Sequence, residues 1–240
     1  QAENYRKMIF AMARDIRVVL IKLADRAHNM LTLESLSEER QRRIARETLE
    51  IYAPIANRLG IGWMKNELEN GSFRYLYPEE YRTIEEKVAK GKEYRDKYVE
   101  KVTSRLVKEL GEAEITGKVA GRPKQFFSIH KKMVDQNISF EEVYDLVGVR
   151  VLTESLGDCY SVLGLVHSLW KPIPGKFKDY IAMPKPNMYQ SLHTTVIGPR
   201  GERVEVQIRS REMHKVCEGG IASHWRYKEK EGENEKSMNQ

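Results

Sequence analysis

Residues 176–191 combine the residue types that bind nucleotides. The segment reads KFKDYIAMPKPNMYQS, with three lysines and one acidic residue, Asp179. Lysines along a loop offer point charges to phosphates, Asn187 can hydrogen-bond a base or a ribose, and Tyr189 offers a flat face for stacking. We interpret the segment as a nucleotide-binding loop. A solvated basic loop with a surface tyrosine would have the same composition, so other segments must separate the two interpretations.

Positive charge is concentrated in two short segments. Residues 118–132 have a net charge of +5 and residues 171–200 a net charge of +4, whereas the whole chain has +6. The rest of the chain is therefore net negative. A concentrated basic site fits a polyphosphate at least as well as an extended nucleic-acid surface, and we expect no DNA partner.

Two acidic residues lie on expected strands of this basic region. Polar and apolar residues alternate over residues 203–209, which places Glu205 on the polar face of a strand. Asp145 directly precedes the apolar run 146–152, an expected central strand. Because Mg²⁺ is usually held by one or two carboxylates plus substrate phosphates, this pair predicts a magnesium site for phosphoryl transfer. The alternative is ordinary salt bridges, with Arg203 or Arg209 for Glu205 and with Arg150 for Asp145.

Residues 121–133, GRPKQFFSIHKKM, would complement the carboxylates. A turn at residues 121–123 leads into an amphipathic helix. Ser128 and the first backbone amides of that helix can receive a phosphate, with Arg122 and Lys124 at its mouth. A capped amphipathic helix without a ligand is the alternative. The chain contains no GxxxxGK[ST] motif, so it is not a P-loop enzyme.

A polar stripe occurs in the N-terminal part. Helical spacing places Asp25, Asn29 and Thr32 on the same face as Val18 and Ile21, a face that we expect to be packed. The stripe is interpreted either as a buried hydrogen-bond network or as one wall of a metal or ligand site.

The apolar pattern changes its period along the chain. Residues 1–110 indicate helices, with a break near Pro54 and Gly60 and one long exposed helix over 81–110. From residue 112 onward, strands alternate with helices. The expected elements are a strand at 146–152, a helix at 158–170, a hairpin of strands 193–197 and 203–209 joined by Gly-Pro-Arg-Gly, and a closing helix at 211–227.

Composition restricts the class of protein. The 240 residues, 40 % of them hydrophobic, suffice for one large or two modest domains. Cys159 and Cys217 lack the spacing of a disulfide framework or a zinc finger, so we expect a cytoplasmic protein. No apolar run is long enough for a membrane span, so we expect no membrane partner. Because the chain begins with Gln1 inside an expected helix, we interpret it as a fragment.

Five segments occur in the order typical of one family: GRPKQFFSIHKKM, YDLVGVRVL, PGKFKDYIAMPKPNMYQSLHTT, EVQIRS and ASHWRYK. Together they resemble the RelA/SpoT family of long guanosine tetraphosphate synthetase/hydrolases, and LADRAHNMLTL resembles the last motif of the family's hydrolase domain. The resemblance implies an α+β fold, in which a helical N-terminal part precedes a nucleotidyltransferase-like mixed sheet flanked by helices. The implied divisions are a remnant of an HD-type hydrolase domain at 1–60, a helical linker region at 61–110, the synthetase domain at 111–227 and a disordered tail at 228–240.

The resemblance also implies an activity and a set of site residues. The synthetase would move the pyrophosphate of ATP onto the 3′-hydroxyl of GDP or GTP and release AMP. Asp145 and Glu205 would bind Mg²⁺, and Glu205 would also activate the 3′-hydroxyl. The implied ATP-binding residues are Arg122, Lys124, Ser128 and Lys132, and the implied guanosine-binding residues are Lys178, Lys185, Asn187, Tyr189, His193 and Gln207.

The hydrolase half would be incomplete. Asp25 would be its one remaining metal ligand, with Asn29 and Thr32 as remnants of the nucleotide pocket, so Mn²⁺-dependent hydrolysis is expected only of the intact parent. The parent is also expected to associate with the ribosome. The chain departs from the family at Met188, where many members have glycine, at Leu31, a common arginine, and at Lys176, where bifunctional members usually have the arginine of R-x-K-D.

Two other functions remain open. A nucleotide- or RNA-binding module without chemistry would share the basic charge and the stacking tyrosine. A generic nucleotidyltransferase would share the carboxylates but transfer a nucleoside monophosphate.

Overall fold

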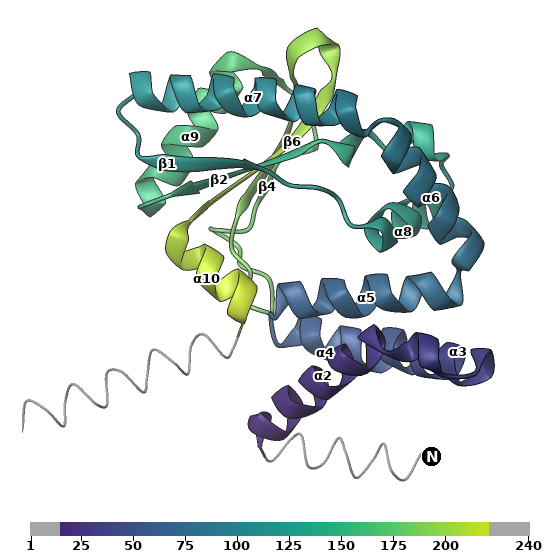
Figure 1. Ribbon diagram of the computed structural model, residues 1–240. Helices are drawn as coiled ribbons and strands as arrows, with labels where there is room; N and C mark the ends of the chain where they lie inside the picture. Colours follow the sequence, from purple (N-terminus) through teal and green to yellow (C-terminus); the bar gives the residue numbers. More distant parts are fainter. Residues whose placement is uncertain (1–14, 221–240) are drawn as a thin grey trace, which may run out of the picture. The chain divides into compact units, whose positions relative to one another are not determined.

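The computed structural model describes residues 15–220 (Figure 1). The expected tail at 228–240, the end of the closing helix and the ASHWRYK segment lie outside the described residues. The chain divides into two compact units, one of residues 1–57 with 62–78 and the other of residues 58–61 with 79–240. The boundaries expected from the family resemblance stay a prediction, because compactness alone does not assign a function to either unit.

The first unit is helical, as expected. Its elements are α2 (Ile16–Leu31), α3 (Glu38–Glu47), a π-helical stretch (Thr48–Tyr52), α4 (Ala53–Arg58) and α5 (Gly62–Leu76). Asp15 caps α2, because its side chain accepts a hydrogen bond from the backbone amide of Arg17 at 2.9 Å. The expected break is confirmed, since α4 ends at Arg58 and Gly60 has a φ of +76°.

The polar stripe of α2 does not lie on a packed face, so that expectation is wrong. Val19, Leu23 and Met30 are the buried residues of this helix, whereas the side chain of Ile21 is 68 % exposed. Asp25 is also exposed. α2 has two apolar stripes on different faces. Only the stripe that continues into the buried Leu33 packs against the rest of its unit.

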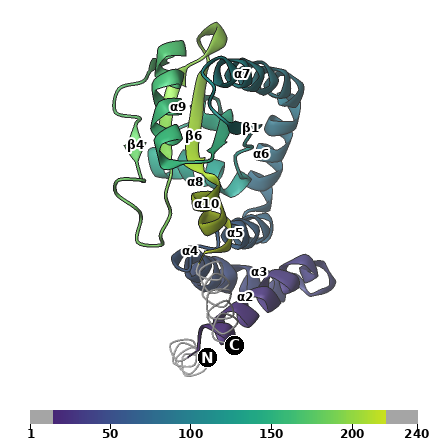
Figure 2. The ribbon, with the colours of Figure 1, turned by 90° about the vertical axis from the view of Figure 1, so that its left-hand side faces the viewer.

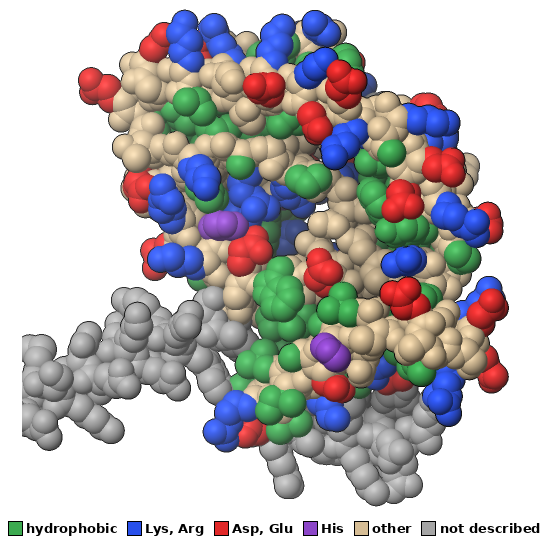
Figure 3. Space-filling view, in the orientation of Figure 1, with side chains coloured by type: hydrophobic (Ala, Val, Ile, Leu, Met, Phe, Trp, Pro, Cys, Tyr) green, Lys and Arg blue, Asp and Glu red, His purple; other side chains and the backbone are tan. Residues whose placement is uncertain are grey.

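The helix expected over 81–110 is two helices. α6 (Pro78–Lys90) and α7 (Lys92–Glu112) are separated at Gly91. α7 is also not exposed all round, because Tyr98, Val102, Leu106 and Leu110 are buried. On its outer face, Lys and Arg are mixed with Asp and Glu over the top of the view in Figure 3, and Lys97 pairs with Glu93 at 2.7 Å. The charged run thus gives one solvated face of a helix that packs on the sheet.

The second unit contains a mixed sheet, as expected. In the described residues it has six strands, in the order β1-β2-β6-β5-β3 with β4 paired to β5. Only the β2 and β6 pair is parallel, and the others are antiparallel. The strands are β1 (Gly117–Gly121), β2 (Gly148–Thr153), β3 (Lys171–Pro172), β4 (Lys178–Asp179), β5 (Leu192–Ile197) and β6 (Arg203–Ser210). The sequence predicted β2, β5 and β6 but not β1 or the two-residue strands β3 and β4.

Helices connect and cover these strands. α8 (Phe126–Gln136) lies between β1 and β2, α9 (Leu156–Leu169) follows β2, and α10 (Arg211–Gly219) follows β6. A capping box at Ser155 and Asp158 begins α9, which confirms the helix expected after the central strand. None of the described helices is long and apolar enough to cross a membrane.

The two faces of the sheet differ in chemistry. α7 and α9 lie against one face, and α10 lies against the other (Figures 1 and 2). Strand alternation sends Val149, Val206 and Ile208 into the core below α7 and α9, where all three are fully buried. The same alternation leaves Glu205 and His193 on the opposite, polar face. The sheet therefore presents its polar side chains on a face separate from its core.

Candidate functional site

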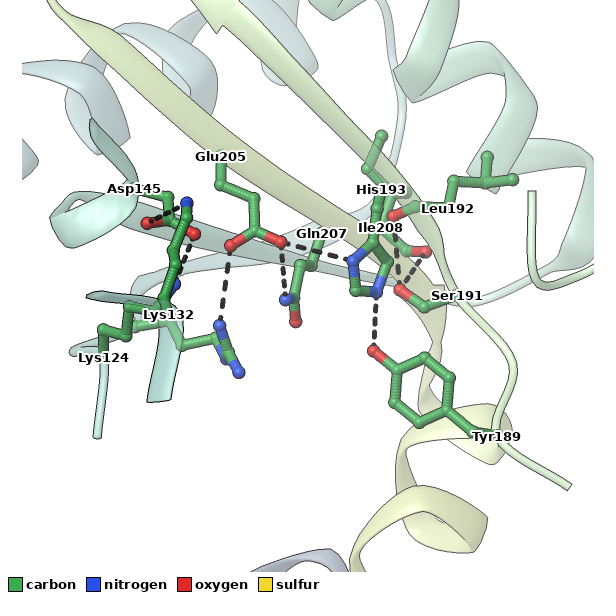
Figure 4. A network of polar contacts seen from close by, with 11 residues as sticks. Lys124, Lys132, Asp145, Tyr189, Ser191, Leu192, His193, Glu205, Gln207 and Ile208 are labelled. Carbon is green, nitrogen blue, oxygen red and sulfur yellow. Dashed lines mark hydrogen bonds and ion pairs between the residues drawn. The ribbon is translucent and has the colours of Figure 1, made fainter. Parts of the chain in front are cut away.

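Asp145 and Glu205 meet where the parallel strands begin. The backbone amide of Glu205 donates a hydrogen bond to the carbonyl of Val147 at 3.2 Å, and Gly148 is the register partner of Glu205. Asp145 lies two residues before Val147, in a short 3₁₀ segment (Tyr144–Leu146). Figure 4 shows both carboxylates in one network of polar contacts, Asp145 with its two lysines and Glu205 with Gln207 and His193. The structure thus brings together the acidic pair that the sequence predicted.

Three side chains hold the carboxylate of Glu205. His193 Nδ1 lies 3.2 Å from Oε1, Gln207 Nε2 donates to the same oxygen at 3.2 Å, and Arg122 Nη1 lies 3.8 Å from Oε2 (Figure 4). Burial alone would raise the pKa of Glu205, but the hydrogen bond from His193, the charge of that imidazole once it is protonated at acidic pH, and the charge of Arg122 lower it to about 2. Glu205 is therefore ionised throughout the physiological pH range.

A hydrogen-bonded chain runs from Glu205 to Tyr189. The phenolic oxygen of Tyr189 lies 2.7 Å from His193 Nε2. Burial lowers the pKa of His193 and raises that of Tyr189, which favours a neutral imidazole and a protonated phenol. A neutral imidazole has one donor and one acceptor, so Nδ1 donates to Glu205 while Nε2 accepts from Tyr189.

Asp145 is held by two lysines. Lys132 Nζ lies 2.8 Å from Oδ1, and Lys124 Nζ is hydrogen-bonded to Oδ2. Burial would raise the pKa of Asp145, but the hydrogen bonds and charges of both lysines lower it. The salt bridges considered from sequence, with Arg150, Arg203 or Arg209, do not occur in the described residues.

Two of those arginines have a different role. Arg209 is 1 % exposed, and its Nη2 lies 3.7 Å from Oε1 of Glu218 on α10. Arg150 Nη1 approaches the same oxygen at 3.8 Å. The alternation in the sequence predicted an exposed polar face along the whole of β6. After Glu205, however, this face is buried, because α10 covers it.

The lysine-rich loop closes over the edge of this face. Lys178 is exposed on β4 and is the register partner of His193. Lys185 is also exposed, and its Nζ lies 4.9 Å from the centre of the Tyr189 ring. Asn187 Oδ1 accepts a hydrogen bond from the backbone amide of Tyr189 at 3.3 Å, which turns the chain at this point.

Met188 has a left-handed backbone, with a φ of +64°. Its side chain is 64 % exposed. The left-handed region disfavours residues with a Cβ, and glycine enters it freely. The loop therefore keeps a backbone conformation suited to glycine at the position where the sequence departs from the family.

Ser128 and Lys132 lie four residues apart on α8, so they share one face of that helix. Ser128 is the third residue of the helix, and its first turn is where free backbone amides can bind a phosphate. Since Lys132 reaches Asp145, the Ser128 face of α8 is directed to the acidic pair.

Sequence reasoning missed Tyr180. Its ring lies edge-on to that of His193 at 5.3 Å and to that of Tyr189 at 6.0 Å, between centroids. The signal was present, because Tyr180 directly follows Asp179 in the same loop. A second omission is the ion pair of Arg122 with Glu205, which links the expected ATP side to the expected guanosine side.

The residues of the expected hydrolase remnant lie in the other unit. Asn29 Nδ2 donates to Asp25 Oδ2 at 3.4 Å, and the hydroxyl of Thr32 donates to the Asn29 carbonyl at 3.2 Å. Between residues 15 and 220, no group of three or more His, Cys, Asp or Glu could hold a metal ion. Asp25 therefore belongs to no such group among the described residues.

Comparison with known proteins identifies relatives of both units. Residues 121–232 match the model of the region found in RelA / SpoT proteins, and residues 1–62 match an HD domain. The chain is 58 % identical over 229 residues to a GTP pyrophosphokinase of Myxococcus xanthus, covering 95 % of this chain and 30 % of that protein. It is 53 % identical over 234 residues to the bifunctional (p)ppGpp synthase/hydrolase RelA of Mycobacterium tuberculosis, covering 98 % and 32 %.

A solved structure of the small alarmone synthetase 1 from Bacillus subtilis, bound to its product pppGpp, matches 50 % of this chain and 70 % of that chain. The identity is 26 % and the TM-score 0.42. The chain spans about 30 % of the length of the curated relatives it matches. On the two family models and the identity to these relatives, the chain belongs to the RelA/SpoT family.

Proposed function

We propose that this chain is a guanosine tetraphosphate and pentaphosphate synthetase, an ATP:GTP 3′-diphosphotransferase. It would transfer the pyrophosphate of ATP to the 3′-hydroxyl of GDP or GTP and release AMP. The observation that carries the proposal is the pair of ionised carboxylates, Asp145 and Glu205, surrounded by Arg122, Lys124 and Lys132. The names of the relatives, GTP pyrophosphokinase and (p)ppGpp synthase/hydrolase, support it.

The two carboxylates fit a magnesium ion. Both are ionised at neutral pH, because their pKa values are lowered. Mg²⁺ is usually bound in such sites by one or two carboxylates and substrate phosphates, so two protein ligands suffice. When bound, the ion would neutralise charge on the pyrophosphate group during its transfer.

The basic residues would hold ATP. Arg122, Lys124 and Lys132 surround the carboxylates, and Ser128 shares the Lys132 face of α8. Phosphoryl transfer needs little covalent chemistry from the protein, so alignment and neutralisation of charge supply most of the catalysis. We assign these four residues to the triphosphate of ATP, and the family resemblance suggests that Arg122 also stacks on the adenine.

The loop of residues 176–191 would hold the guanosine substrate. Tyr189 would stack on guanine, while Lys178 and Lys185 neutralise its 5′-phosphates. His193 and Gln207 lie beside Glu205 and would orient the ribose. Asn187 would read the base edge.

Glu205 would orient the 3′-hydroxyl more than deprotonate it. A general base works best when its pKa lies near the working pH, and the pKa of Glu205 is about 2. As a hydrogen-bond acceptor in fixed geometry, the carboxylate would align the hydroxyl with the pyrophosphate group. The family resemblance implied that Glu205 activates the 3′-hydroxyl. We limit that role to aligning the hydroxyl.

Product analysis tests the proposal. The chain would be incubated with ATP, GDP and Mg²⁺, and the products separated by anion-exchange chromatography. AMP and a guanosine 5′,3′-bisdiphosphate are expected in equal amounts. Release of free pyrophosphate with transfer of a nucleoside monophosphate would instead identify a generic nucleotidyltransferase, and binding of both nucleotides without turnover would identify a binding module.

For the longer parent, we propose a cytoplasmic location and association with the ribosome.

A further inference from the structure

The two oxygens of Asp145 are each occupied by an ammonium group. Lys132 Nζ lies 2.8 Å from Oδ1 in an ion pair, and Lys124 Nζ donates a hydrogen bond to Oδ2. All three side chains are largely buried, with exposed fractions of 21 % for Asp145, 14 % for Lys124 and 20 % for Lys132. The contacts are therefore part of the folded site and not a surface ion pair that water readily replaces.

The three residues come from separate elements. Lys124 precedes α8, Lys132 lies in its second turn, and Asp145 precedes β2. Their cluster carries two positive charges and one negative charge. Glu205 is held differently, by the neutral side chains of His193 and Gln207 and by Arg122 at the longer distance of 3.8 Å. Excess positive charge is thus directed specifically at Asp145.

This arrangement opposes the entry of a free divalent cation. A metal ion at Asp145 would have to displace an ammonium group and then remain beside it, and like charges a few ångströms apart in a partly buried site repel strongly. A polyphosphate removes both obstacles, because its oxygens can bind the lysines and can ligate the metal.

We propose that Lys124 and Lys132 exclude free Mg²⁺ from Asp145, so that the metal enters only together with the polyphosphate of ATP. The two lysines exchange the Asp145 carboxylate for phosphate oxygens when ATP binds, and this exchange frees Asp145 for the metal. The inference rests on the proposed function, since it takes ATP as the polyphosphate. It assigns the lysines a role before ATP arrives, in addition to binding it.

The test is binding of Mn²⁺ to the nucleotide-free chain, measured by electron paramagnetic resonance of the unbound ion. The wild-type chain should show no saturable site up to about 1 mM Mn²⁺. Lys124→Met and Lys132→Met should each raise the affinity, and the double variant should raise it at least about tenfold. Lys131→Met is the matched control, because Lys131 is exposed on the same helix and has no ion pair in the described residues. It should leave Mn²⁺ binding unchanged.

Asp145→Asn identifies the site that is gained. Added to the double variant, it should abolish the new Mn²⁺ site, and in the wild-type background it should change nothing. A wild-type chain that binds Mn²⁺ as tightly as the double variant would overturn the proposal. Loss of Mn²⁺ binding on Asp145→Asn alone would also overturn it, because Asp145 would then bind the free ion in the wild-type chain. This measurement does not depend on whether the lysine variants fold.

Failure of this proposal is distinct from failure of the proposed function. AMP formation by the wild-type chain without any gain of Mn²⁺ affinity in the lysine variants would refute only the lysine role. A gain of affinity without AMP formation would refute the synthetase function and leave the lysine role in place.

Discussion

His193 and Glu205 face each other across neighbouring strands, with Nδ1 of the imidazole 3.2 Å from Oε1 of the carboxylate. This contact determines the tautomer of His193, and thereby directs the phenolic proton of Tyr189 to Nε2. Tyr189, in the loop that we propose binds the guanosine substrate, is thus connected through one side chain to Glu205, the carboxylate that we propose orients the 3′-hydroxyl. A displacement of Tyr189 would therefore alter the hydrogen bond between His193 and Glu205.

Removal of either carboxylate charge should abolish synthesis. Asp145→Asn and Glu205→Gln keep the size of each side chain, and each should lower kcat by at least about a hundredfold, as loss of a major charge-stabilising group does. AMP release in a steady-state assay measures the effect. Glu212→Gln, at an exposed position in the first turn of α10, is the control. Near-normal turnover with an unchanged circular dichroism spectrum would show that the carboxylates form structural ion pairs only.

Glu205 should contribute to stability in a defined pH range. Its pKa falls from 4.5 to about 2 on folding, so its stabilisation is complete above about pH 5 and is lost as the pH falls toward 2. Between about pH 5 and about pH 3, this one group should cost the wild-type chain on the order of 2 kcal/mol of unfolding free energy. Glu205→Gln should lack that loss in urea unfolding followed by circular dichroism. Parallel pH profiles for the two chains would contradict the shift.

The ring and the hydroxyl of Tyr189 should have separable effects. Tyr189→Ala removes the stacking face and should weaken binding of GDP by roughly 1–3 kcal/mol, with ATP binding scarcely changed. Tyr189→Phe keeps the ring, so it should retain most of the GDP affinity and lower kcat through the lost hydrogen bond to His193. Calorimetry with each nucleotide and turnover assays distinguish the two. Equal weakening of ATP and GDP by Tyr189→Ala would indicate collapse of the loop instead.

Glycine at position 188 should be tolerated or stabilising. Met188 has a φ of +64° and an exposed side chain, so Met188→Gly removes an unfavourable Cβ contact without loss of packing. We expect a gain of roughly 0.5–1 kcal/mol in unfolding free energy. Met188→Val should destabilise, because a β-branched side chain fits this region worse. Thermal unfolding of the three chains is the measurement, and a lower midpoint for Met188→Gly than for wild type would contradict the reasoning.

The chain should not hydrolyse guanosine tetraphosphate, even with added Mn²⁺. A catalytic metal needs several protein ligands in fixed geometry, and within residues 15–220 Asp25 belongs to no group of three or more His, Cys, Asp or Glu that could hold a metal ion. Pyrophosphate release is the measurement, with a longer parent chain as the positive control. Release by this chain that Asp25→Asn abolishes would show that the assignment of the hydrolase ligands is wrong.

Local patterns predicted the elements of the site. The apolar run before and through β2 and the turn residues between β5 and β6 gave strands close to those observed, since strand alternation and turn chemistry depend on neighbouring residues. The break at Gly91 was hidden, because a single glycine costs a helix only about 1 kcal/mol and the pattern on both sides is helical. On α2, two apolar stripes were equally regular, and only packing against other helices decides between them.

The partners of the carboxylates could not be predicted. Arginines close in sequence were the simplest candidates, but Asp145 binds Lys124, 21 residues away, and Glu205 binds His193 of the neighbouring strand. Such pairs depend on the order of strands in the sheet, which alternation along one strand does not determine. The family resemblance named the same residues as binding groups without stating how they contact each other.

The parallel pairing of β2 with β6 implies an order of folding. β5 and β6 are joined by a short turn and can pair early, whereas β2 reaches β6 only after the chain of about fifty residues between them has closed, which is entropically slow. The Asp145 carboxylate is brought to Glu205 by that later step. The acidic pair should therefore be absent from any early intermediate, and substitutions in β2 should slow folding more than equally destabilising substitutions in the first unit.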